Sequence, residues 1–203
     1  MKYLKEECSF YYWGPLLFRT KLHDKQIKAL IKLSEEAKLK KIDHRKKLVG
    51  VIKKELNIDI PKYTDIVRPA LNLFKVVYKN WYPVNHSPNI KNLYTVSAWV
   101  NFMKKGEFNP PHSHNKCDFS SVLYLNIPPG LEKERKQFLG KGPGPGSIVF
   151  TIAGPQKFYN NLYSFVPEVG DFFIFPYSLI HFVGPFQCSG TRTSIAANFK
   201  LET

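Results

Sequence analysis

The sequence predicts a mostly β protein with flanking helices (α+β), in which a double-stranded β-helix, or jelly roll, packs on amino-terminal helices. Near residue 90 the apolar residues change from helical spacing to strand-like alternation. Beyond that point, short β segments are separated by turn-rich stretches, as in a double-sheet jelly roll. Aromatic residues make up 15% of the chain, which suits a β-rich sandwich. Further strands are expected at about 119 to 127, 147 to 152, 162 to 166, 171 to 175, 180 to 185 and 192 to 200.

The amino-terminal half is expected to hold an edge strand and two helices. Residues 9 to 20 have an extended character and predict the edge strand. Residues 23 to 39 mix leucine and isoleucine with charged residues at helical spacing, which predicts an amphipathic helix. A second helix is expected over 63 to 80, although Pro69 disturbs its first turns.

The chain length suits one domain over residues 1–203. In this domain, residues 1–90 would form a helical support region and residues 91–203 the jelly-roll core with the functional site. In the segment LYTVSAWVNFM, strand alternation places Thr95, Ser97, Trp99 and Asn101 near one face.

Charge and composition restrict the location and the partners. The 30 basic and 16 acidic residues give a formal net charge of +14, which favours anionic partners. Residues 38–54, KLKKIDHRKKLVGVIKK, are either a basic helical face that contacts phosphates or a solvated helix exterior, and we favour the second. No run of eighteen apolar residues predicts a membrane span. Three cysteines at unrelated spacing (Cys8, Cys117 and Cys188) favour a reducing, cytoplasmic location.

Two histidines, His112 and His114, precede the apolar segment SSVLYLNI, and His181 lies in a second apolar segment. Residues i and i+2 of a strand share a face, so both imidazoles of the pair can reach one metal ion. A third imidazole from a distant strand would complete one face of that ion and leave other positions open. The alternative is a pair of surface histidines beside the Pro110–Pro111 turn. The other histidines (His23, His44 and His86) have polar or helical neighbours and are expected to be exposed.

A strand that begins at Arg192 carries small and apolar residues. Alternation places Arg192 and Ser194 on one face and Ile195 on the other. A buried, unpaired guanidinium is costly, but it suits a carboxylate that arrives with a ligand. An exposed arginine at the strand end is the alternative.

The ordered set of motifs resembles the iron(II)- and 2-oxoglutarate-dependent oxygenases. The set comprises H-x-H, a strand ending in Tyr124-Leu125-Asn126, the segment GDFFIFP, His181 and Arg192-x-Ser194. The resemblance is to the prolyl-hydroxylase-like branch, and most of all to an uncharacterised group of marine bacteria and their phages. It covers roughly residues 95 to 200 and touches WGPLLFRTKL and KLVGVIKKEL.

The resemblance implies a role for each matching residue. His112 and His181 match the first and the distal metal ligands, while Arg192, Tyr124 and Ser194 match the groups that hold the far carboxylate of 2-oxoglutarate. At the second ligand position, where most of the family has a carboxylate, this chain has His114. We expect His114 to be the ligand, with Asp118 as the alternative. Candidate pocket walls, which are equally candidates for sheet core, are Trp99, Phe102, Phe173 and Phe175.

The resemblance also implies cofactors and a reaction. Iron(II), the cosubstrate 2-oxoglutarate and O2 are expected, with ascorbate as an optional reductant. The expected reaction is a hydroxylation that releases succinate and CO2. The substrate is unknown: a small molecule, a peptide, a protein side chain or, given the charge, a nucleic acid.

Two other classes of protein remain open from the residues alone. One is a cupin-like metal-binding protein or isomerase without oxygen chemistry, and the other is a basic nucleic-acid-binding module with incidental histidines. The loop GKGPGPG (140–146) is followed by a strand, so we expect a turn and no phosphate-binding loop. The segment LEKERKQF (131–138) is expected to be a surface loop, with a lid over the pocket as the alternative.

Overall fold

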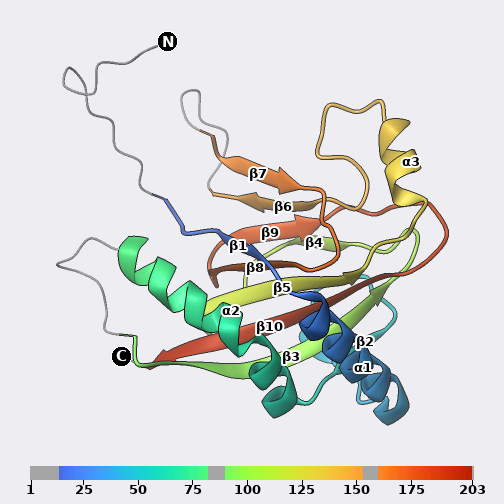
Figure 1. Ribbon diagram of the computed structural model, residues 1–203. Helices are drawn as coiled ribbons and strands as arrows, with labels where there is room; N and C mark the ends of the chain where they lie inside the picture. Colours follow the sequence, from blue (N-terminus) through green and yellow to red (C-terminus); the bar gives the residue numbers. More distant parts are fainter. Residues whose placement is uncertain (1–13, 82–89, 153–159, 203) are drawn as a thin grey trace, which may run out of the picture.

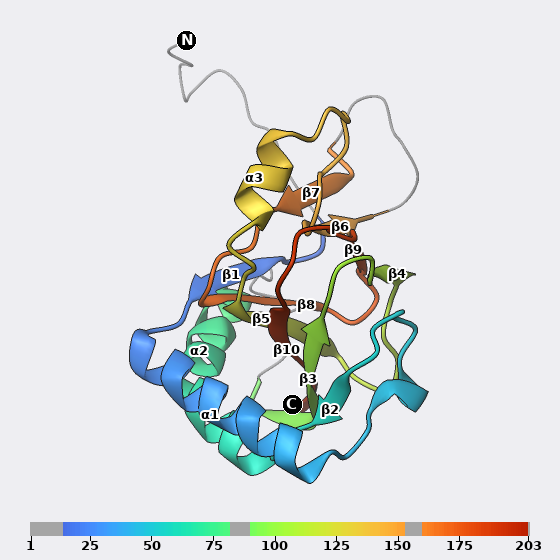
Figure 2. The same ribbon diagram turned by 90° about the vertical axis from the view of Figure 1, so that its right-hand side faces the viewer.

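Two antiparallel β-sheets face each other, and two helices cover the outer face of the larger sheet (Figures 1 and 2). The computed structural model describes residues 14–81, 90–152 and 160–202. The larger sheet has the order β1-β8-β5-β10-β3-β2 and the smaller one β4-β9-β6-β7. The strands are β1 (Phe18–Lys21), β2 (Glu55–Asn57), β3 (Asn92–Met103), β4 (Asn109–His112), β5 (Phe119–Asn126), β6 (Ile148–Thr151), β7 (Leu162–Phe165), β8 (Asp171–Pro176), β9 (Ile180–Val183) and β10 (Arg192–Glu202).

The first helix, α1 (Asp24–Lys40), matches the predicted amphipathic helix. His23 and Gln26 form a capping box at its start, and Lys41 ends it in a left-handed conformation. Ile27, Leu30 and neighbouring apolar residues one turn apart are buried against the larger sheet. Helical spacing of apolar residues therefore predicted both the helix and its buried face.

The second helix, α2 (Ile60–Trp81), begins three residues earlier than expected and continues through Pro69. Asp59 caps its start, since its side chain accepts a hydrogen bond from the Lys62 N–H at 3.0 Å. Pro61, near this cap, takes a position where a missing N–H costs little. Tertiary packing compensates for Pro69, because Tyr63, Phe74 and other residues of α2 are buried against the sheet.

The predicted strands of the carboxyl-terminal half are confirmed to within about two residues. The predicted edge strand is also confirmed where the structure describes it, because β1 pairs only with β8 at the end of the larger sheet. The part of that prediction at residues 9–13 lies outside the described residues. The mostly β fold with flanking helices is therefore confirmed.

The face predicted for Thr95 of β3 is wrong. A register shift between Asn198 and Phe199 moves Thr95 to the helix side, where its hydroxyl bonds to that of Thr64. Phe102, for which pocket wall and sheet core were both open, belongs to the core under the helices. Trp99 and Asn101 do face the space between the sheets. The bulge explains the change of face at Thr95, because one extra residue reverses the alternation beyond it.

Two predictions about connecting segments also change. Residues 38–54 do not form one basic helix, because α1 ends at Lys40 and only a 3-10 helix, Arg45–Lys47, follows before β2. Residues 131–138 contain a short helix, α3 (Leu131–Lys136), where a surface loop was expected, and Leu131 is buried. No helix in the described part of the chain combines the length and the apolarity that crossing a membrane requires.

Candidate metal centre and cosubstrate pocket

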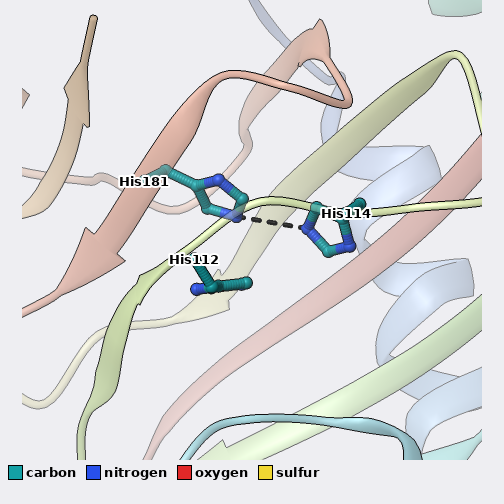
Figure 3. A group of neighbouring side chains, drawn as sticks. All are labelled: His112, His114 and His181. Atoms are coloured by element: carbon teal, nitrogen blue, oxygen red, sulfur yellow. Dashed lines mark hydrogen bonds between the residues drawn. The ribbon is translucent and has the colours of Figure 1, made fainter. Parts of the chain in front are cut away.

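Three imidazoles meet between the two sheets, close to the end of β4 (Figure 3). His112 is the last residue of β4 and lies directly opposite His181 of β9 in the strand register. His114 follows the strand end, and its backbone N–H donates to the Tyr177 carbonyl at 2.9 Å. One ring nitrogen from each residue lies within 4.8 Å of the others. Histidines 67 residues apart in the chain therefore form one cluster.

Backbone carbonyls orient two of these rings. Nδ1 of His112 donates to the Pro110 carbonyl at 2.7 Å, and Nδ1 of His181 donates to the Leu179 carbonyl at 3.0 Å. These bonds leave the Nε2 lone pair of each ring for a metal, an arrangement typical of histidine ligands. Nε2 of His181 lies 3.3 Å from Nε2 of His114 (Figure 3). The donor set of three neutral imidazoles fits a divalent transition metal.

Burial keeps the three imidazoles neutral. It lowers the pKa of His181 to about 3, and the nearby His112 adds to the effect. Burial likewise lowers the pKa of His114 to about 4 and lowers that of His112. A neutral imidazole is the form that binds metal, so the cluster is ready for a cation over the physiological pH range.

These pKa shifts predict acid sensitivity of the metal-free protein. His181 is neutral when folded but binds a proton below pH 6.5 when unfolded, so stability falls as the pH drops below 6.5. The expected loss from His181 between pH 7.5 and 5 is about 2 kcal/mol. Urea unfolding of wild type and of His181→Gln at both pH values measures this loss of stability. The variant should lack the His181 contribution, because glutamine stays neutral in both states. Equal pH dependence of the two proteins would contradict the assignment.

Asp118, the alternative ligand, has a structural role elsewhere. Its carboxylate accepts the Leu201 N–H at 2.8 Å, and its backbone joins the strand ends of β10 and β8. Among the described residues, the candidate metal cluster contains histidines only. A strand-end aspartate that satisfies a backbone donor has little freedom to turn toward the cluster.

Arg192, Ser194 and Tyr124 lie together on the inner face of the larger sheet. Tyr124 pairs with Ser194 in register, and the Arg192 guanidinium lies 5.4 Å from the centre of the Tyr124 ring. Arg192 is 2% exposed and donates to the Gly146 carbonyl at 3.2 Å. The predicted sharing of one face by Arg192 and Ser194 is confirmed, and the exposed alternative for Arg192 is wrong.

Two buried donors in this group have no partner. They are Nε of Arg192 and the hydroxyl of Tyr124, whose pKa is raised to about 12 because it is buried. Burying a cation and a hydroxyl without acceptors is costly unless a ligand supplies the acceptors. A carboxylate meets that need, since it accepts several hydrogen bonds and neutralises the guanidinium. The residues present therefore fit the far carboxylate of 2-oxoglutarate.

A single pocket of about 440 Å³ contains the three histidines, Arg192 and Ser194. This volume is in the range that encloses small ligands. Phe175 and Trp99 form part of its wall as predicted, whereas Phe173 is buried in the core between the sheets behind it. No aspartate or glutamate among the described residues lines the pocket.

His44 is a pocket residue that the sequence did not reveal. Its predicted exposure is wrong: it is buried, its ring stacks on Trp99 at 4.7 Å, and its Nδ1 lies 2.7 Å from Oδ1 of Asn57. The segment between α1 and β2 folds over the edge of the pocket and carries His44 inward. His23 is exposed as expected, and His86 lies outside the described residues.

Comparison with known proteins agrees with this geometry. The protein family described as "Putative 2OG-Fe(II) oxygenase" matches residues 97–198, half of the chain. No curated protein sequence matches. A Pseudomonas putida prolyl-4-hydroxylase structure is similar, with 15% identity over 92% of this chain and 93% of that chain and a TM-score of 0.59. A Trichoplax adhaerens prolyl hydroxylase, bound to a hypoxia inducible factor peptide fragment, has 11% identity over 92% and 83% and a TM-score of 0.60.

A third similar structure is HygX from Streptomyces hygroscopicus with nickel, 2-oxoglutarate and hygromycin B bound. It has 13% identity over 92% of this chain and 82% of that chain, with a TM-score of 0.52. At these identities the structural neighbours establish the shared jelly-roll fold, while the family match covers the segment that carries the histidine cluster and Arg192. The chain belongs to this family and is an iron(II)- and 2-oxoglutarate-dependent oxygenase.

Proposed function

We propose that His112, His114 and His181 bind the catalytic iron(II) and that Arg192, Tyr124 and Ser194 hold the far carboxylate of 2-oxoglutarate. The observation that carries the proposal is one pocket, lined by Arg192, in which three imidazoles converge, together with two buried donors of Arg192 and Tyr124 that have no acceptor. The two donors are costly to bury without acceptors, and a carboxylate would supply them. The three imidazoles offer ring nitrogens to a metal ion.

The protein side chains supply orientation, charge and exclusion of water. Arg192 and Tyr124 anchor one end of the cosubstrate, which directs its 2-oxo acid end along the pocket toward the histidines. Phe175 and Phe150 pack on the His181 ring at 4.6 and 6.2 Å and shield the cluster from solvent on that side. Bound iron(II) supplies the redox chemistry that couples decarboxylation of 2-oxoglutarate to oxidation of the substrate.

A site of three imidazoles carries one more positive charge than a site of two imidazoles and a carboxylate. The extra charge strengthens the attraction for an anionic cosubstrate such as 2-oxoglutarate. Lys116 and Arg192 are the lysine and arginine side chains that line the pocket among the described residues, which adds to this bias. We therefore propose a neutral or anionic substrate, either a peptide side chain or a small molecule.

Two variants test whether His114 or Asp118 is the second metal ligand. His114→Ala is expected to weaken iron(II) binding at least ~10-fold, the loss that follows removal even of groups that only orient a ligand. Asp118→Ala is expected to keep iron affinity and to lose about 1 kcal/mol of stability with the Leu201 hydrogen bond. Anaerobic iron titration and urea unfolding of both variants measure these effects. Loss of iron affinity in the Asp118 variant alone would reverse the assignment.

Succinate release under iron(II), ascorbate and O2 tests the proposed activity. We expect wild type to release succinate, and to do so faster with peptides or small molecules that fit the pocket, while the His181→Ala protein releases none. Release that is unchanged in that variant would exclude the histidine cluster as the site.

We further propose that residues 1–203 act as one oxygenase domain. Both β1 and β2, from the amino-terminal half, are strands of the larger sheet, which ties that half to the jelly-roll core. The cysteines in the described residues, Cys117 and Cys188, are free thiols, which supports the cytoplasmic location that we propose.

A further inference from the structure

A row of four buried polar side chains crosses the larger sheet on its inner face. Glu55 of β2 lies opposite Asn101 of β3, Asn101 lies opposite Ser194 of β10, and Ser194 lies opposite Tyr124 of β5. The four strands are neighbours in this order (Figure 1). Residues directly opposite in antiparallel strands have Cβ atoms roughly 5 Å apart, so each side chain can reach the next.

The end of the row at Glu55 and Asn101 has a surplus of acceptors. Glu55 is 1% exposed and Asn101 is 5% exposed. Neither carboxyl oxygen of Glu55 has a hydrogen-bond partner, and neither has Oδ1 of Asn101. The Asn101 amide donates from Nδ2 to the Ser194 hydroxyl at 3.4 Å. Two adjacent buried acceptors without a donor are unfavourable, and a proton on one of them removes the conflict.

We propose that Glu55 is a neutral carboxylic acid that donates a hydrogen bond to Oδ1 of Asn101 and thereby positions Ser194 for the cosubstrate. The bond holds the Asn101 amide with Nδ2 toward Ser194. Ser194 then accepts from Asn101, which leaves its own hydroxyl proton to be donated to a carboxylate beside Tyr124 and Arg192. Glu55 is thus a positioning residue, and this part of the inference rests on the proposed cosubstrate site.

The surroundings of Glu55 favour the neutral form. Burial raises its pKa to about 7, and the like charges of Asp43 and Glu107 act in the same direction. Arg45 opposes them but is exposed and is paired with Asp43 at 2.7 Å. His44 is a further titratable neighbour, and its backbone N–H donates to the Glu55 carbonyl at 2.9 Å.

Glu107 offers a matched comparison in the same region. It is also buried, but its two carboxylate oxygens accept the backbone N–H groups of Lys53 and Lys104 at 3.2 and 2.8 Å. Both carboxylate oxygens of Glu107 therefore have donors, whereas neither oxygen of Glu55 has one.

The first test follows the protonation of Glu55 in metal-free protein without cosubstrate. A group whose folded pKa is raised loses its contribution to stability as the pH rises through that pKa. The urea midpoint of Glu55→Gln relative to that of wild type should rise from pH 4 to pH 8.5. The reason is that Glu55 loses stability between its unfolded pKa of 4.5 and its folded pKa of about 7, whereas the amide stays neutral. Glu107→Gln should be less stable than wild type at both pH values. Parallel pH profiles of wild type and Glu55→Gln would overturn the proposal.

The second test measures whether the hydrogen bond between Glu55 and Asn101 affects binding of the cosubstrate. It uses calorimetric titration of 2-oxoglutarate into manganese(II)-loaded protein at pH 6.5. Glu55→Gln, whose amide can still donate to Asn101, should bind within about twofold of wild type. Glu55→Ala and Asn101→Ala should each bind about tenfold more weakly, as expected for a lost buried hydrogen bond. The double variant should bind no more weakly than Asn101→Ala alone. Wild-type affinity for 2-oxoglutarate in both alanine variants would overturn the proposed hydrogen-bond row from Glu55 to Ser194. Losses of affinity that add up in the double variant would do the same.

The two tests also separate this inference from the proposed function. If wild type failed to bind 2-oxoglutarate, the cosubstrate assignment would fail, and with it the role of Glu55 there. The hydrogen bond itself would still be tested by the same double-variant cycle measured as urea midpoints of metal-free protein. Additive midpoints in that cycle would exclude the bond between Glu55 and Asn101.

Discussion

Replacement of His181 by alanine is expected to abolish iron(II) binding and, with it, turnover of 2-oxoglutarate. His181 is the most deeply buried of the three imidazoles, and its ring centre lies 4.2 Å from that of His112 and 5.1 Å from that of His114. Its loss removes one of three donors, so we expect iron affinity to fall at least ~100-fold. Anaerobic addition of iron(II) and 2-oxoglutarate gives wild type the weak visible absorption of the chelate, and the variant should lack it.

His23→Ala is the matched control, because His23 is an exposed histidine at the start of α1. That variant should keep the absorption band and wild-type iron affinity. Full iron affinity in His181→Ala, or equal losses in both variants, would contradict the metal assignment.

Replacement of Arg192 by alanine is expected to weaken the binding of 2-oxoglutarate by roughly 1.5 to 3 kcal/mol, the range for a lost charge-assisted contact. This corresponds to about a 10- to 150-fold rise in the dissociation constant. Iron(II) binding without cosubstrate should change little, because Arg192 is not among the clustered metal-ligand candidates. Titration of 2-oxoglutarate into iron-loaded protein under anaerobic conditions measures the effect.

An exposed arginine of α2 provides the comparison for Arg192. Arg68 lies outside the pocket and pairs with Asp65 on the surface, so Arg68→Ala should bind 2-oxoglutarate like wild type. If Arg192→Ala bound the cosubstrate as tightly as Arg68→Ala, another group would have to hold the far carboxylate.

Local periodicity predicted the strands and the shared face of Arg192 and Ser194, because alternation is a property of each strand alone. It does not account for the pairing of His112 with His114, since β4 ends at His112 and His114 lies beyond the strand. The family resemblance then connected distant segments, including His181, that no local pattern joins. These elements depend on short-range geometry and on the order of motifs, which the sequence displays directly.

Other features depend on contacts between distant segments and had no local signal. The bulge opposite Asn198 reverses the face of Thr95 and exists only in the pairing of β3 with β10. His44 and Glu55 follow a lysine-rich helix and look solvated in the sequence, yet the segment that carries them packs over the pocket. Their burial follows from the position of β2 beside β3, which local composition does not determine.

The most direct test of the metal centre is the position of a bound ion. Crystals grown with manganese(II) should show one anomalous-scattering peak that contacts a ring nitrogen of each of His112, His114 and His181. A peak that includes the Asp118 carboxylate in place of His114, or three rings that share no ion, would contradict the three-histidine site.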